Sequence, residues 1–111
     1  MDTKILEEIG LTDSEIKVYL ALLELGSSKK GPIVKKAGIT SSKIYEVIDK
    51  LIERGLASYV VKDKVKYFNA APPSRIKDYL KEKEAKLKEQ ENELDKLLPS
   101  LELKQKLKEK K

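Results

Sequence analysis

The side chains of this chain that could bind an anion or read a polar surface are lysines and hydroxyl residues in three short stretches. From residue 26 to residue 66, ten Lys or Arg stand against four Asp or Glu, whereas residues 1–25 carry more acids than bases. Clustered ammonium groups attract phosphates, and serine or threonine hydroxyls can bond to the edges of bases. The pattern predicts double-stranded DNA as the partner. The candidate contact residues are Lys29, Lys30, Thr40, Ser41, Ser42, Lys43, Tyr45, Lys62, Lys64 and Lys66.

A plainer interpretation of the same lysines stays open. Charged residues make up 39% of the chain, and a Lys/Glu-rich surface also keeps heat-adapted proteins in solution. On that interpretation the lysines near residues 62–66 would only solvate the tip of a hairpin.

Composition argues against an enzyme. The chain has no cysteine and no histidine, which removes thiol nucleophiles, histidine bases and Cys/His metal sites, so we expect no cofactor and no metal. Ser42 and Lys43 are neighbours on a helix and point about 100° apart, so they cannot form a catalytic dyad. No apolar run approaches the ~20 residues that span a bilayer, and the first ten residues lack the features of a signal peptide. We therefore expect a cytoplasmic protein that does not contact membranes.

Residues 38–55 form the element that would position the candidate contacts. Their apolar residues follow the spacing of an amphipathic helix, with Thr40 or Ser41 as its N-cap. Asp49 and Glu53 lie on the opposite face and would repel phosphates, so only the first two turns could lie against DNA. The predicted buried stripe is Ile44, Val47, Ile48 and Leu51.

Two earlier helices are predicted to support this one, after a short helix within residues 1–9. Thr12 and Glu15 have the T-x-x-E spacing of a capping box, in which each side chain satisfies a backbone N–H. The next helix begins between Lys29 and Pro32 and ends near Ala37, so a glycine-bearing turn joins it to the helix of residues 38–55, as in a helix-turn-helix. The core stripe of the helix that Thr12 starts is predicted to be Ile16, Tyr19, Leu20 and Leu23.

The hydrophobic period changes from 3.6 to 2 after Gly55. Residues 56–61 and 65–70 are rich in β-branched and aromatic side chains, which predicts an antiparallel hairpin. Its basic tip would form a wing that rests on the sugar-phosphate backbone.

The C-terminal part is predicted to be a long helix through which two copies pair. Leucines recur every seven residues, the pattern of a coiled-coil seam, although polar residues interrupt it. Pro99 should kink or end the helix near Leu98, and residues 104–111 should fray. The predicted domains are residues 1–73, which bind DNA, and residues 74–111, which dimerise. The dimerisation residues are Ile76, Leu80, Leu87, Leu94 and Leu97.

The segments LTDSEIKVYLALLELGSS and IVKKAGITSSKIYEVIDKLIERGL, followed by the hairpin and Pro72-Pro73, resemble the N-terminal domain of the TrmB family of archaeal transcriptional regulators. The resemblance covers roughly residues 5–95. It implies a fold that is mainly α with a small β-hairpin, a winged helix-turn-helix followed by a long C-terminal coiled-coil-like helix. It also implies a homodimer that binds operator DNA.

The chain departs from this family in two respects. Many relatives have a Pro-Arg pair where this chain has Thr40-Ser41, so Ser41, Ser42 and Lys43 would have to read the bases. Many relatives also carry a sugar-binding domain, for which 111 residues leave no room. Either this is a single-domain relative or the remainder of a longer chain was removed, so no small-molecule effector can be inferred. We expect a sequence-specific regulator with two half-sites; the alternative is a winged-helix module that docks onto proteins of the transcription machinery.

Overall fold

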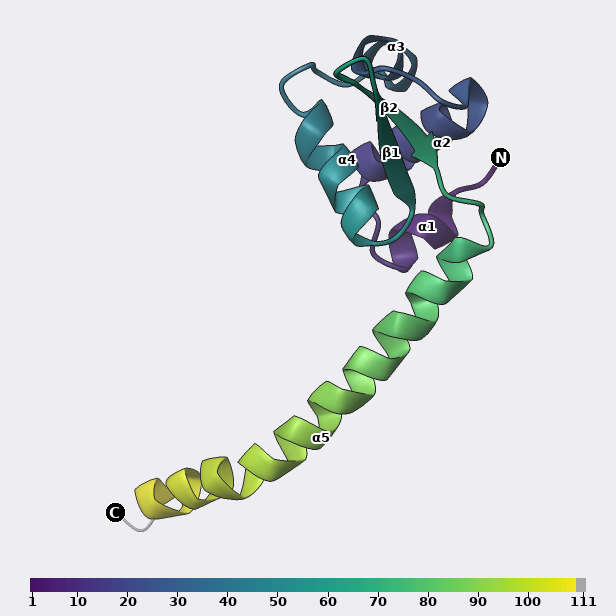
Figure 1. Cartoon of the computed structure of the whole chain (residues 1–111). Helices are drawn as coiled ribbons and strands as arrows, with labels where there is room; N and C mark the ends of the chain where they lie inside the picture. The colour runs from purple at the N-terminus through teal and green to yellow at the C-terminus, as the bar shows by residue number, and fades with distance from the viewer. Residues whose placement is uncertain (110–111) are drawn as a thin grey trace. The chain divides into compact units, whose positions relative to one another are not determined.

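The structure, a computed structural model, describes residues 1–109. In that range it is mainly helical, with one antiparallel hairpin and a long C-terminal helix, which confirms the predicted fold class (Figure 1). The elements in chain order are α1 (Lys4–Glu8), α2 (Asp13–Leu25), α3 (Lys30–Ala37), α4 (Ile44–Glu53), β1 (Ala57–Lys62), β2 (Val65–Ala70) and α5 (Arg75–Glu109).

Helix α2 lies at the centre of the core because it contacts α1, α3, α4 and β2. Ile16 and Tyr19 are buried as predicted, but Leu23 is 42% exposed and the neighbouring Leu22 is fully buried. The single predicted stripe was too narrow: a helix covered from several sides buries a wider face than one stripe. Val18 is fully buried for the same reason.

Thr12 caps α2 as predicted, and its hydroxyl accepts a hydrogen bond from the Glu15 N–H at 3.1 Å. The second half of the predicted capping box is wrong. The Glu15 carboxylate is buried and bonds to Arg54, so it is engaged away from the Thr12 backbone.

Helix α4 begins at Ile44, later than predicted. Residues 41–43 form a turn in which the Lys43 N–H donates to the Thr40 carbonyl at 3.1 Å. The Thr40 hydroxyl lies 3.2 Å from the Ser42 hydroxyl, and no side chain caps the helix, so the predicted Thr40 or Ser41 cap is wrong. The predicted apolar stripe is confirmed, because its four members are all buried, namely Ile44, Val47, Ile48 and Leu51.

The hairpin pairs Ala57 with Ala70 at its base and Lys62 with Val65 at its tip. Asp63 and Lys64 form the two-residue turn with φ values of 49° and 66°. Positive φ at both positions is what a type I′ turn requires, and this turn matches the twist of the two strands. On the outer side of β2, Ser28 and Phe68 exchange two backbone hydrogen bonds of 3.0 and 2.7 Å, which joins the wing to the residues just before α3.

Pro99 was expected to kink or end the helix near Leu98. Helix α5 continues through Pro99 to Glu109, so the second alternative, an end near Leu98, is wrong. Proline removes one backbone hydrogen bond, but every residue from Glu84 to Glu109 is exposed and water can bond to the freed carbonyl. The tail that was expected to fray is helical as far as Glu109, and residues 110 and 111 lie outside the described part. The chain divides into two compact units, one that ends at Tyr79 and one that begins at Leu80.

Candidate nucleic-acid interface

Two lysines stand at the start of α3. Lys29 is the N-cap residue and Lys30 the first helical residue, and no side chain caps this end. The Lys29 ammonium lies 5.8 Å from the centre of the Tyr67 ring, and the Lys30 ammonium lies 4.9 Å from the centre of the Tyr45 ring. Positive charge at a helix N-terminus opposes the helix dipole, so these lysines cost a little stability unless an anion approaches.

The wing contributes the second group of lysines. Lys62, Lys64 and Lys66 are all exposed around the Asp63-Lys64 turn. The Lys66 ammonium lies 4.5 Å from the centre of the Tyr59 ring, and that of Lys62 lies 6.0 Å from the Tyr67 ring centre. Cation–π contacts of this kind contribute about 0.5–1 kcal/mol each at exposed sites, enough to orient a lysine and weak enough to release it to a phosphate.

The start of α3, the first turn of α4 and the wing enclose a hollow of about 440 Å³. Four of the predicted lysines and the predicted tyrosine line it, although they come from three different elements. No carboxylate is among the lining residues, so the hollow presents a surface of one charge sign. The lining residues are Lys29, Lys30, Gly31, Tyr45, Lys64, Val65, Lys66 and Phe68.

The other predicted contact residues lie outside the hollow. Four of them are exposed in the turn that leads into α4, which begins at Ile44: Thr40, Ser41, Ser42 and Lys43. Lys62 is exposed on the wing and shares the Tyr67 ring with Lys29. All ten predicted residues are therefore accessible or line the hollow, and they lie on α3, the α4 entrance and the wing.

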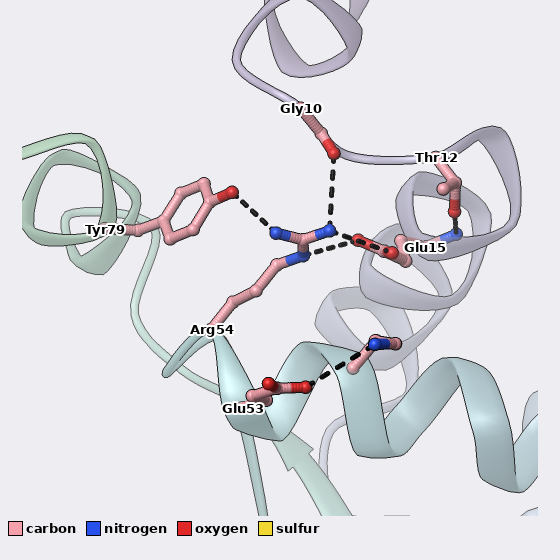
Figure 2. A network of polar contacts seen from close by, with 7 residues as sticks. Gly10, Thr12, Glu15, Glu53, Arg54 and Tyr79 are labelled. Atoms are coloured by element: carbon pink, nitrogen blue, oxygen red, sulfur yellow. Dashed lines mark hydrogen bonds and ion pairs between the residues drawn. The ribbon is translucent and has the colours of Figure 1, made fainter. Parts of the chain in front are cut away.

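Sequence reasoning missed a polar network around Arg54, the residue that follows α4 (Figure 2). Its Nε donates to Glu15 Oε2 at 2.8 Å and its Nη2 to Glu15 Oε1 at 3.3 Å. Its Nη1 donates to the Tyr79 hydroxyl at 2.6 Å, and Nη2 also reaches the Gly10 carbonyl at 3.4 Å. The hydrogen bond to Glu15, more than any other contact, raises the pKa of Arg54 above its ordinary value.

A signal for this network was present in the sequence. Glu15 falls at the i, i+3, i+4 and i+7 spacing with Val18, Tyr19 and Leu22, which places a carboxylate on the buried face of α2. A buried carboxylate needs a cation or several donors nearby, so the pattern calls for a basic partner from another element. The sequence does not say which one.

Other site classes find little support in residues 1–109. No group of three or more histidine, cysteine, aspartate or glutamate residues in this range is arranged to hold a metal ion. None of the helices in the range combines the length and the apolar character that a membrane crossing needs.

Comparisons with known proteins identify a family and a fold. The family model described as "Sugar-specific transcriptional regulator TrmB" matches residues 6–74. The sugar-sensing regulator TrmBL1 of Pyrococcus furiosus is 40% identical over 55 residues, which are 50% of this chain and 16% of that protein. The uncharacterized protein YrhO of Bacillus subtilis is 43% identical over 51 residues, which are 46% of this chain and 18% of that protein. The chain thus spans less than a fifth of the length of either relative.

Solved structures show the same fold at low identity. The archaeal chromatin protein TrmBL2 superimposes with a TM-score of 0.77 at 19% identity, over 88% of this chain and 39% of that one. A MarR-family regulator from Silicibacter pomeroyi gives a TM-score of 0.58 at 17% identity, over 88% of this chain and 75% of that one.

Proposed function

The chain belongs to the TrmB family of transcriptional regulators, and from this premise we propose that it binds double-stranded DNA as a homodimer, at an operator with two half-sites. The family model and the MarR-family neighbour are described as regulators of transcription, and TrmBL2 is described as a chromatin protein. A regulator of this kind acts where the genome is, so the proposal includes a cytoplasmic or nucleoid location.

The observation that carries the proposal is the lysine-lined hollow. Lys29 and Lys30 from the start of α3 face Lys64 and Lys66 from the wing, with no acid between them. A phosphate strand that enters the hollow would meet ammonium groups from two elements and the free N–H groups at the start of α3. Such contacts fix the position of a protein on the duplex and supply most of its salt-dependent affinity.

Base recognition is assigned to the entrance of α4. Ser41, Ser42 and Lys43 are exposed there, and Tyr45 follows in the first helical turn with 49% of its surface exposed. Hydroxyl and ammonium groups can bond to acceptors on base edges in the major groove, and an aromatic ring can contact a thymine methyl. Asp49 and Glu53 are exposed further along α4, so the later turns would be repelled by phosphates.

Pairing of two copies is assigned to α5. In the part of α5 beyond Tyr79, eight leucines are more than a third exposed, which is costly for isolated helices in water. Ile76 is half-buried against the core of its own domain, so the proposed seam begins at Leu80. The residues assigned to the seam are Leu80, Leu87, Leu94 and Leu97.

Selection of bound sequences from a random pool of duplex DNA tests the proposal. We expect an inverted repeat whose half-sites lie about one helical turn apart, ~34 Å. A pool that stays random, or protein that retains no DNA, would refute the proposed function.

One observation favours a second candidate, a module that docks onto other proteins. Strand β1 pairs with β2 on one side only, and it exposes three successive large apolar residues, Tyr59, Val60 and Val61, by 44%, 47% and 59%. A bare apolar edge can accept a strand from a partner protein. Tight binding to a protein of the transcription machinery, without measurable affinity for DNA, would favour this candidate.

A further inference from the structure

Arg54 ties the end of α4 directly to the beginning of α5. Its guanidinium holds Glu15 of α2 with two nitrogens and the Tyr79 hydroxyl with the third (Figure 2). Its central carbon also lies 5.4 Å from the centre of the Tyr79 ring. This side-chain link is shorter than the covalent path from α4 to α5, which runs through the whole hairpin and the Pro72-Pro73 segment.

The three side chains of this network are largely buried, which restricts their movement. The Glu15 side chain is 4% exposed and that of Arg54 is 24% exposed. Tyr79 is 8% exposed. Because a planar guanidinium offers its donors in a fixed fork, simultaneous bonds to a carboxylate and a hydroxyl fix its orientation. Glu15 is itself fixed on α2, because its N–H donates to the hydroxyl of Thr12, which caps that helix.

The network lies between the end of the helix assigned to DNA and the start of the helix assigned to dimerisation. Arg54 follows the last residue of the helix assigned to DNA, and Tyr79 is the last residue of the first compact unit. The helix assigned to dimerisation therefore leaves the DNA-binding unit at the residue that Arg54 holds. Direct side-chain contacts of this kind are a physical route by which a change in one helix can affect another.

We propose that Arg54 is a positioning residue that holds the start of α5 against the end of α4 and thereby sets the spacing between half-sites that the dimer accepts. This rests on the proposed function, because it assigns α4 to DNA and α5 to pairing. The Tyr79 hydroxyl is the part of the network that serves this role, whereas the Glu15 pair mainly anchors Arg54.

Tyr79→Phe tests the proposal, because it removes the hydroxyl that Arg54 bonds and keeps the buried ring. Tyr19→Phe is the matched control. Tyr19 is also a buried tyrosine, and its hydroxyl donates to the Ala71 carbonyl at 3.1 Å, away from Arg54. Both variants remove a phenol hydroxyl and keep the buried ring, so a difference between them reports on the surroundings of the Tyr79 hydroxyl, where Arg54 bonds.

The first readout is affinity for duplexes in which the spacer between half-sites is lengthened or shortened by one or two base pairs. We expect Tyr79→Phe to reduce the preference for the best spacer about tenfold, as loss of a hydrogen bond to a charged group allows, while affinity for a single half-site stays within about twofold. Tyr19→Phe should keep the wild-type preference. Equal weakening at all spacers by Tyr79→Phe would overturn the positioning role.

The second readout needs neither DNA nor a dimer. The chain has no cysteine, so Asp49→Cys on α4 and Lys77→Cys on α5, both exposed positions, can carry a pair of spin labels. Labelled chains are diluted in an excess of unlabelled protein, so that only distances within one chain are measured. We expect one narrow distance distribution in the parent and in Tyr19→Phe, and a broad one in Tyr79→Phe. An unchanged distribution in Tyr79→Phe would overturn the inference. If the parent binds no DNA, the proposed function fails, and this measurement still decides whether Arg54 holds α5.

Discussion

The Lys30 ammonium lies 4.9 Å above the ring of Tyr45, so the start of α3 and the first turn of α4 meet through side chains of two different kinds. In the proposed complex the lysine would bind a phosphate, and the ring would contact base edges in the major groove of DNA. Both residues line the same hollow. In that complex the pair would connect the surface that binds the phosphates of any duplex with the residues assigned to base recognition.

The first prediction is therefore that the α4 entrance determines sequence preference and that the wing binds phosphates. Lys43→Ala should change the sequence preference, because Lys43 precedes α4 and can face base edges. Lys64→Ala should weaken binding to all sequences alike, since a wing lysine meets only phosphates. Binding to an array of duplexes that differ at single base pairs separates the two effects. Indistinguishable profiles for the two variants would contradict the assignment.

Loss of the buried ion pair should reduce stability strongly. Glu15→Gln leaves the Arg54 guanidinium without its carboxylate, and breaking a buried pair in this way typically costs about 3–5 kcal/mol. Because Arg54 is 24% exposed, we expect about 3 kcal/mol. Urea unfolding measures the change. The control Glu24→Gln breaks an exposed pair with Lys36 and should cost less than about 1 kcal/mol; a similar loss for both variants would show that the burial of Glu15 is unimportant.

Self-association should depend on the leucines assigned to α5. Leu87→Glu places a charge in the proposed seam, where Leu87 is 61% exposed in the single chain. We expect the protein to become monomeric in sedimentation equilibrium at micromolar concentration. Leu103→Glu is the matched control, because Leu103 is 57% exposed but lies on the roughly opposite side of the helix at 3.6 residues per turn. Monomers from both variants, or from neither, would count against this seam.

Stability should fall in alkaline solution partly through Tyr19. Burial raises the pKa of its phenol above the ordinary value of 10.0. The folded protein therefore holds the phenolic proton more tightly than the unfolded chain, and the stabilisation is complete below pH 10 and is lost as pH rises through the folded-state pKa. The difference in the free energy of unfolding between wild type and Tyr19→Phe should be constant below pH 10 and shrink above it. A difference that is constant up to pH 11.5 would disprove this.

The sequence predicted those parts of the fold that depend on neighbours along the chain. The stripe of Ile44, Val47, Ile48 and Leu51 follows from helical spacing, and the hairpin follows from its alternating residues. The start of α4 does not follow from the local hydroxyl residues, because the Thr40 hydroxyl pairs with that of Ser42 and no side chain caps the helix. The helix does not end at Pro99, because the cost of a proline is lower in an exposed helix.

The contacts between distant segments could not be predicted. Glu15 and Arg54 are 39 residues apart, and spacing along α2 reveals only that Glu15 is buried. Local charge and the order of elements in the chain predict the lysines of the hollow as contact residues, without predicting that they converge. Their convergence depends on the bonds between Ser28 and Phe68, which hold the wing beside α3. Backbone pairing of this kind leaves no mark in side-chain patterns.

The salt dependence of DNA affinity tests most directly the claim that lysines from α3 and the wing converge on one phosphate surface. The slope of log affinity against log salt should be steep in the wild type, with a fall of about 10³-fold between 50 and 200 mM if some six phosphates are neutralised. The double variant Lys64→Gln/Lys66→Gln should reduce the slope by about 2. A control with Lys17→Gln and Lys96→Gln, exposed lysines paired with Asp13 and Glu93, should leave it unchanged. A flat wild-type slope, or the same slope in the wing variant, would contradict the account.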